Sequence, residues 1–209
     1  MRNDDNTWLG PVMDWVLDVD VDASRGAVEG LRRKYPNESN RALVERVFAT
    51  ARWKGTASGV LTGLPATLLL SAPAAATDAA VMLRLEVNAA AKAALVYDPR
   101  FFDDESAAYE LLVPILGMTV TSQALRELGV RFGMGATRQV IRAVLSRGSL
   151  AAFKRVMWKY FGLAVTRRAV LTKALPIVGG LIGGAWNWAE MTAVRDRCIT
   201  YFEGGELSS

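Results

Sequence analysis

Residues 175–190 read LPIVGGLIGGAWNWAE, and the sixteen residues from 174 to 189 carry no charge. The four glycines of this run stand as two pairs spaced four apart, Gly179/Gly183 and Gly180/Gly184. Residues four apart share one face of a helix, and glycine on that face lets a second backbone approach closely. Pro176 suits the first turn of a helix, where its missing N–H is harmless. We therefore expect a helix that is buried by close packing.

A second glycine row occurs in residues 55–77, which are also uncharged. Its members, again four apart, are Gly55, Gly59 and Gly63. We expect helices over 55–64 and 177–186 to pack against each other. The run is nominally long enough to span ~30 Å of hydrocarbon. However, Pro65, Pro73 and several hydroxyl residues interrupt it, so we expect buried core or hairpin helices, with true membrane spans as the alternative.

Helical signals dominate the rest of the chain, and few segments alternate as strands do. Ser39 or Asn40 can cap one helix and Asp104 another. Candidate helices cover 8–18, 24–34, 119–132, 136–146, 149–161, 166–174 and 176–203. The sequence thus predicts an all-α, compact multi-helix bundle with glycine-rich, close-packed central helices. We expect an acidic N-terminal arm with short helices over 1–39, a helical domain over 40–203 and a flexible tail over 204–209.

The formal net charge of +4 is unevenly distributed. Residues 126–173 hold eleven Lys or Arg residues against Glu127 alone. Such a segment suggests an anionic partner. Basic residues alternate there with aromatic ones, and the candidate membrane-surface residues are Arg138, Arg142, Lys154, Arg155, Trp158 and Lys159. This mixture suits an anionic membrane surface, whereas nucleic acid is an unlikely partner because no nucleic-acid-binding fold is recognisable. An ordinary solvated or amphipathic helix face is the alternative.

Several classes of chemistry are excluded or disfavoured by composition. The chain has no histidine, which removes Ser-His-Asp and Cys-His nucleophile systems and imidazole metal sites. Cys198 is the only cysteine, so no internal disulfide forms, in keeping with a reducing compartment. The opening residues MRNDDNTWLG are acidic and polar, so we expect no secretory signal. We also expect no cofactor.

Four polar residues are candidates for a ligand site or a structural polar core: Asp78, Arg84, Asn187 and Glu190. Asp78 and Arg84 are six positions apart, about 240° around a helix, so each needs a partner from another helix. We expect Arg84 to pair with Glu190 or Asp196. Structural ion pairs are one interpretation, and an acid–base or headgroup-binding site is the other. The Asn187 amide can cross-link helices or line a polar ligand site.

An acidic series near the N-terminus has the spacing of a calcium-binding loop. Asp18, Asp20, Asp22 and Glu29 match the ligand positions 1, 3, 5 and 12 of an EF-hand. The position that needs glycine for the sharp turn is Ala23. We therefore expect a solvated acidic linker, with calcium binding as the alternative.

Two blocks of the chain resemble the EcsC family. The first, LTGLPATLLLSAPAAATDAAVMLRLEVNAAAKAALVYDP, has the Gly-rich stretch, acidic residue, Arg and closing Tyr-Asp-Pro of that family, at Gly59, Gly63, Asp78, Arg84, Tyr97, Asp98 and Pro99. The second, ALPIVGGLIGGAWNWAEMTAVRDRCITYF, is similar to the family's C-terminal helix. The likeness covers about residues 40–203. The turn reads LVYDP here, where the family often has YGYDP.

The resemblance implies an association with bacterial membrane processes, since the family is named from a component encoded with an ABC transporter that affects protein secretion. It supplies no catalytic residues. We therefore expect a non-enzymatic accessory protein, cytoplasmic and peripheral to the inner membrane, that docks on anionic lipid or a membrane protein complex. An apolar or lipid ligand between the Gly-rich helices would fit. The alternatives are a lipid- or peptide-directed enzyme that uses Asp78 or Glu190, and a partner-bound, immunity-type subunit.

Overall fold

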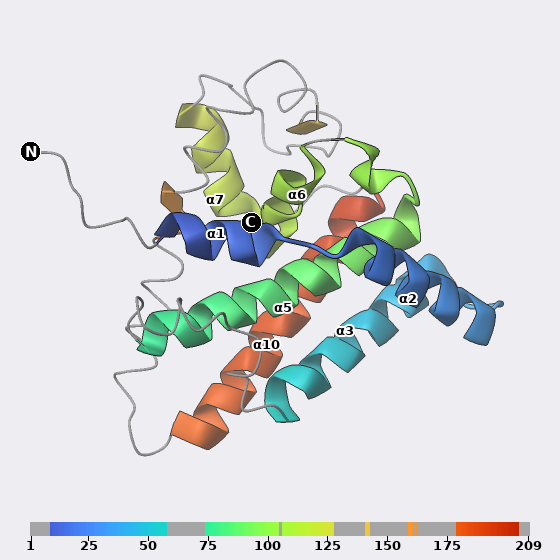
Figure 1. Ribbon diagram of the computed structural model, residues 1–209, viewed down its shortest axis with the longest axis horizontal. Coiled ribbons are helices and arrows are strands. Elements are labelled where there is room, and N and C mark those ends of the chain that lie inside the picture. Colours follow the sequence, from blue (N-terminus) through green and yellow to red (C-terminus); the bar gives the residue numbers. More distant parts are fainter. Residues whose placement is uncertain are drawn as a thin grey trace, which may run out of the picture.

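The structure, a computed structural model, describes residues 9–57, 74–104, 106–127, 141–142, 159–160, 162 and 179–204. The helices in chain order are α1 (Leu9–Leu17), α2 (Val21–Lys34), α3 (Asn40–Ala57), α5 (Ala74–Tyr97), the 3-10 turn η3 (Phe101–Asp103), α6 (Ala107–Glu110), α7 (Leu112–Glu127) and α10 (Gly179–Phe202). None of the described residues lies in a strand. The predicted all-α class is confirmed, and Figure 1 shows the long helices α3, α5 and α10 side by side.

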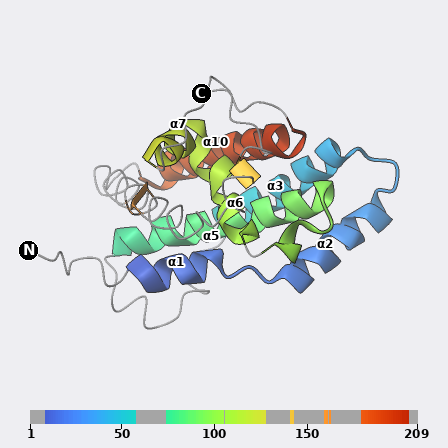
Figure 2. The same cartoon turned by 90° about the horizontal axis from the view of Figure 1, so that it is seen from above.

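Helix α5 is the centre of the molecule, in contact with α1, α2, α3, α7 and α10. Figure 2 shows it between α1 and α10. Its composition explains this position, because the stretch Ala89–Val96 is almost entirely small or apolar and all of it except Lys92 is buried. A helix that is apolar all round is covered on all sides. Alanine side chains also let the neighbouring helices approach closely.

The N-terminal helices share this core. Val12, Met13 and Val16 of α1 and Val28 of α2 are buried and belong to the same apolar cluster as the side chains of α5 and α10. The helices that the sequence placed in a separate acidic arm are thus packed on α5. Their acidic residues face outward, as the exposed Asp14, Asp18 and Asp22 show.

The starts of α2 and α3 are fixed by local capping, in which a side-chain oxygen accepts a free backbone N–H. Asp20 accepts the backbone N–H of Ala23 at 2.8 Å, and Ser39 accepts that of Ala42 at 3.2 Å.

The cap at Asp20 argues against the calcium alternative at Asp18, Asp20, Asp22 and Glu29. Residues 21–29, which would form most of the binding loop, are part of a helix that starts at Val21. Glu29 instead lies 3.9 Å from Arg33 on the same helix. No cluster of metal-ligating side chains occurs among the described residues.

Helices α3 and α10 pack against each other in opposite directions. Arg41, near the start of α3, lies 3.9 Å from Glu203, just beyond the end of α10. Arg52, near the end of α3, donates to the hydroxyl of Thr192 at 3.2 Å.

The glycine run that opened the sequence analysis is helical, as predicted. Gly179, Gly180, Gly183 and Gly184 all lie in the first two turns of α10. Gly55, the first member of the other row, lies near the end of α3, and these two helices do pack on each other. The surroundings of Gly183 and Gly184, like Gly59 and Gly63 themselves, lie outside what the structure describes. The close approach of the two glycine rows therefore stays a prediction.

Helix α7 contains a sharp break at Gly117, whose backbone has φ 80° and ψ 172°. The predicted helix over 119–132 begins just beyond this point. At such a break, carbonyl groups of the preceding turn need hydrogen-bond donors from outside the helix. Arg197 of α10 provides two of these donors. Its Nε donates to the Pro114 carbonyl at 2.7 Å and its Nη2 to that of Ile115 at 2.9 Å.

Within the described part of the chain, no helix has both the length and the apolar character that crossing a bilayer requires. The two uncharged runs, 55–77 and 174–189, lie partly outside that part.

Candidate functional site

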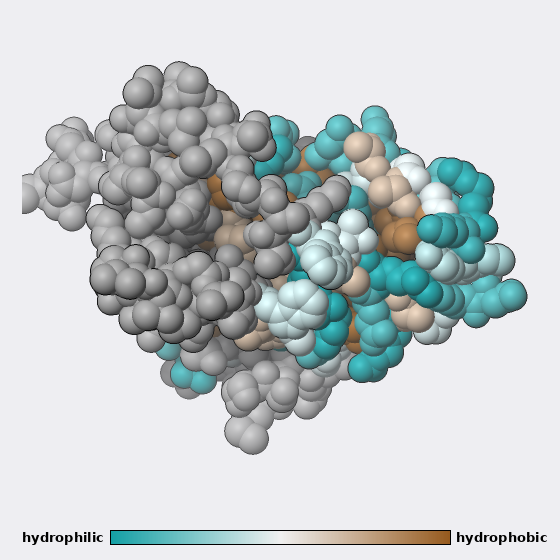
Figure 3. Space-filling view, turned by 90° about the horizontal axis from the view of Figure 1, so that it is seen from below, coloured by the Kyte–Doolittle hydropathy of each residue, from teal (hydrophilic) through white to brown (hydrophobic). Residues whose placement is uncertain are grey.

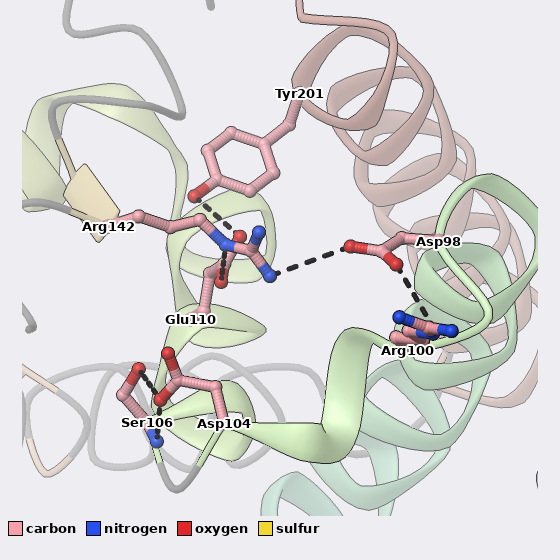
Figure 4. A network of polar contacts seen from close by, with 7 residues as sticks. All are labelled: Asp98, Arg100, Asp104, Ser106, Glu110, Arg142 and Tyr201. Atoms are coloured by element: carbon pink, nitrogen blue, oxygen red, sulfur yellow. Dashed lines mark hydrogen bonds and ion pairs between the residues drawn. The ribbon is translucent and has the colours of Figure 1, made fainter.

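A buried carboxylate, Glu110, is the centre of a polar cluster that joins several helices. It ends α6 and is 1% exposed. Arg142 donates from Nε to its Oε2 at 2.9 Å, and the Tyr201 hydroxyl donates to its Oε1 at 3.3 Å (Figure 4). Tyr201 is itself fully buried on α10. Both oxygens of a carboxylate deep in the protein are therefore bound by donors from other segments of the chain, as a buried charge requires.

Arg142 connects this carboxylate to the end of α5. Its Nη2 lies 3.6 Å from Oδ2 of Asp98, and its guanidinium carbon lies 5.7 Å from the centre of the Phe101 ring. Burial acts to lower the pKa of Arg142, but the hydrogen bond to Glu110 and the charges of Glu110 and Asp98 raise it above its ordinary value. The guanidinium thus stays charged and ties residue 142 to the corner formed by α5, α6 and α10.

The loop beneath the cluster is held by short-range hydrogen bonds. Asp98 accepts the backbone N–H of Arg100 at 3.1 Å. Asp104 accepts both the backbone N–H and the hydroxyl of Ser106 at 2.7 Å each (Figure 4). These bonds, the backbone one foremost, lower the pKa of Asp104. They shape the turn that leads from α5 into α6. The predicted helix cap by Asp104 is wrong, because Ser106 occupies the N-cap position of α6 and the Asp104 carboxylate accepts from Ser106 rather than from the helix.

Tyr97 and Asp98, which belong to the Tyr-Asp-Pro motif, both have structural partners. The Tyr97 hydroxyl donates to Oε1 of Glu203 at 2.9 Å, and its ring stacks on Phe202 with 6.3 Å between the ring centres. Burial, together with the hydrogen bond to Glu203, raises the pKa of Tyr97 above its ordinary value. Tyr97 thus joins the end of α5 to the end of α10, while Asp98 faces Arg142.

The polar candidates from the sequence do not meet in one site. Arg84 donates to the Trp15 carbonyl, stacks over the Trp15 ring at 4.5 Å and lies 4.0 Å from Asp18. The predicted pairing of Arg84 with Glu190 or Asp196 is wrong because α1, not α10, covers the side of α5 that carries Arg84.

Glu190 lies 3.9 Å from Arg197, which belongs to the same helix, α10. The side chains of Asp78 and Asn187 lie outside the described residues.

The predicted membrane-surface residues are only partly described. Lys159 is exposed and binds Glu127 at 2.9 Å, and Tyr160 donates to the same carboxylate oxygen at 2.9 Å. Arg142, from the same set, faces the buried cluster instead. Arg138, Lys154, Arg155 and Trp158 lie outside the described residues.

Two buried carboxylates, Glu86 and Glu110, were not singled out from the sequence. Glu86 is 0% exposed in the middle of α5. Burial raises the pKa of the Cys198 thiol, and the charge of Glu86 adds to this effect. A signal was present for both carboxylates, because each is a single acidic residue inside an otherwise largely apolar helical stretch, LRLEVNAAA and AAYELLVPI. A position with apolar neighbours on every side of the helix is a buried position.

The described cluster of Glu110, Arg142 and Tyr201 is a structural clasp, that is, a set of polar contacts that ties segments of the chain together. Arg142 and the Tyr201 hydroxyl both donate hydrogen bonds to the Glu110 carboxylate. The Tyr201 hydrogen bond is therefore directed at a buried carboxylate rather than at a position that a ligand could reach. The described part of the chain brings no nucleophile together with a base in this cluster.

No family model matches this chain, and no curated protein or solved structure matches it. The likeness to the EcsC family therefore rests on the residues quoted in the sequence analysis.

Proposed function

We propose that this protein is a non-enzymatic accessory protein that docks on anionic membrane surfaces, in keeping with its likeness to the EcsC family. The observation that carries the proposal is the charge of residues 126–173. Glu127, the only acidic residue of that segment, is bound by Lys159 and Tyr160. The segment thus holds no further carboxylate for its ten other basic residues. One of them, Arg142, pairs with carboxylates outside the segment.

A non-enzymatic role accounts better for the polar groups than catalysis does. The carboxylate of Glu110 is neutralised by Arg142, and Glu190, the described member of the two carboxylates considered for an enzyme, lies beside Arg197. Both carboxylates are thus engaged by a cation, as in structural ion pairs. In this proposal the protein acts at the cytoplasmic face of a bacterial inner membrane, on lipid or on a membrane protein complex. An apolar ligand between the Gly-rich helices remains part of it.

The direct test is sedimentation with vesicles of pure phosphatidylcholine and of phosphatidylcholine mixed with phosphatidylglycerol. We expect binding to the mixed vesicles only, because each basic residue near an anionic surface contributes up to about 1 kcal/mol. The variant Lys154→Glu/Arg155→Glu should lose most of this binding. Arg33→Glu/Lys34→Glu, which changes the net charge equally on α2, should retain it. Equal binding to both vesicle types, or to neither, would contradict the proposal.

A further inference from the structure

Two tryptophans stand out as the large hydrophobic side chains that are exposed on the described surface. Trp53 is 68% exposed and Trp188 is 47% exposed. They belong to α3 and α10, and Arg52 joins them: it precedes Trp53 in the chain, and its guanidinium carbon lies 4.4 Å from the centre of the Trp188 ring. The hydrogen bond from Arg52 to Thr192 fixes the two helices to each other here. Trp53 lies near the end of α3 and Trp188 in the first half of α10. The end of α3 and the start of α10 lie at the lower edge of Figure 1.

An exposed indole is costly in water, but it suits one environment well. Tryptophan combines a large apolar ring with one N–H donor, and it concentrates at the boundary between lipid headgroups and acyl chains. Figure 3 shows the molecule from below, and its coloured part is largely hydrophilic or pale with small hydrophobic areas between. Such a surface favours shallow contact with headgroups over deep insertion into hydrocarbon.

The charges around the indoles point to an anionic surface. Arg195 lies one turn beyond Thr192 on α10, close enough that its positive charge, after burial, is a cause of the lowered pKa of Arg52. Asp196 opposes this effect and binds Arg195 at 2.8 Å. Two guanidinium groups that repel each other are stabilised by an anion that contacts both, and a phosphodiester is an anion that the planar guanidinium fits well. The chain also continues from Trp53 to a further cation, Lys54.

We infer that Trp53, Trp188 and Arg52 form an anchor that enters the headgroup region of an anionic phospholipid bilayer. The indoles reach the level of the glycerol backbone, and Arg52 with Arg195 binds lipid phosphate. With the anchor inserted, the end of α3 and the start of α10 face the membrane. This inference rests on the proposed function and adds to it a defined contact, because the anchor lies outside the basic segment 126–173.

Depth-dependent quenching tests the position of the indoles. Phosphatidylcholine/phosphatidylglycerol vesicles with brominated acyl chains should quench the tryptophan fluorescence of the bound wild-type protein. Trp53→Phe/Trp188→Phe should reduce this quenching. Trp15→Phe, which alters the half-buried indole beneath Arg84, is the matched control and should leave the quenching unchanged. Undiminished quenching in the double variant would overturn the inference.

Affinity provides the second readout. Trp53→Ala/Trp188→Ala should weaken binding to the mixed vesicles about tenfold, and Arg52→Gln about fivefold. Arg33→Gln, an exposed arginine on α2, should bind as the wild type does. If the wild type binds but all variants match it, the anchor is refuted and the proposed function stands. If the wild type does not bind anionic vesicles, both are refuted.

Discussion

Replacing Arg142 by Met tests the buried clasp, because the substitution keeps most of the side-chain volume and removes the charge. The Glu110 carboxylate, 1% exposed, would lose the cation at its Oε2 and keep the Tyr201 hydroxyl at 3.3 Å from its Oε1. Breaking a buried ion pair costs about 3–5 kcal/mol. The Arg142 side chain is 37% exposed, so water can reach part of the site. We therefore take the lower end and expect a loss of about 3 kcal/mol in the free energy of unfolding.

The assay is urea unfolding followed by circular dichroism, with a double-mutant cycle to isolate the pair. Glu110→Gln in the Arg142→Met background should recover much of the loss, since an amide needs no counter-charge. Lys159→Met is the matched control: its ion pair with Glu127 has the same 2.9 Å length, but that carboxylate is 39% exposed. This control should unfold close to the wild type. The reasoning fails if Arg142→Met and Lys159→Met lose the same stability.

Four further predictions concern the backbone and the titratable groups. The φ of 80° and ψ of 172° at Gly117 suit glycine alone, so Gly117→Ala should cost about 2 kcal/mol in urea unfolding. Gly26 lies inside α2 with open space around it, so Gly26→Ala should stabilise by about 0.5–1 kcal/mol, and equal effects of the two substitutions would contradict this reasoning. Burial raises the thiol pKa of Cys198, so this thiol should react with a thiol reagent only at the rate of unfolding, and rapid reaction of the native protein would refute its burial. Ser106→Ala removes the hydroxyl but keeps the backbone N–H, so it should raise the lowered pKa of Asp104 part of the way toward its ordinary value in an NMR titration; an unchanged pKa would refute the role of the Ser106 hydroxyl. The stability that this carboxylate contributes is present above the ordinary carboxyl range and is lost as the pH falls through the lowered pKa, so the variant should lose it at a higher pH.

The helices and their ends could be predicted from the sequence because their signals are local. Ser39 stands just before an apolar pattern, Pro99 follows the end of a long helical stretch, and Gly117 separates two periodic segments. Each of these residues acts through the backbone within a few positions. The same locality applies to the acidic series considered as a calcium loop: four acidic residues at those intervals also fit a helix whose first turn is capped by Asp20.

Pairings between distant segments could not be predicted in the same way. Arg84 needed a partner, but sequence spacing does not reveal that α1 rather than α10 covers its side of α5. Glu110 and Arg142 are 32 positions apart, and their pairing depends on how the chain packs rather than on any periodicity. The exposure of Trp53 and Trp188 is also a tertiary property, because tryptophan is on average a highly buried residue.

The affinity of the wild-type protein for phosphatidylcholine/phosphatidylglycerol vesicles, measured as a function of salt, tests the central claim most directly. Ions screen exposed charges over about 10 Å at 0.1 M and about 3 Å at 1 M ionic strength. The account predicts tight binding at low salt that weakens steeply as salt is added. It predicts no binding to vesicles of phosphatidylcholine alone at any salt concentration. Binding that is insensitive to salt, or that does not depend on phosphatidylglycerol, would contradict docking on an anionic surface.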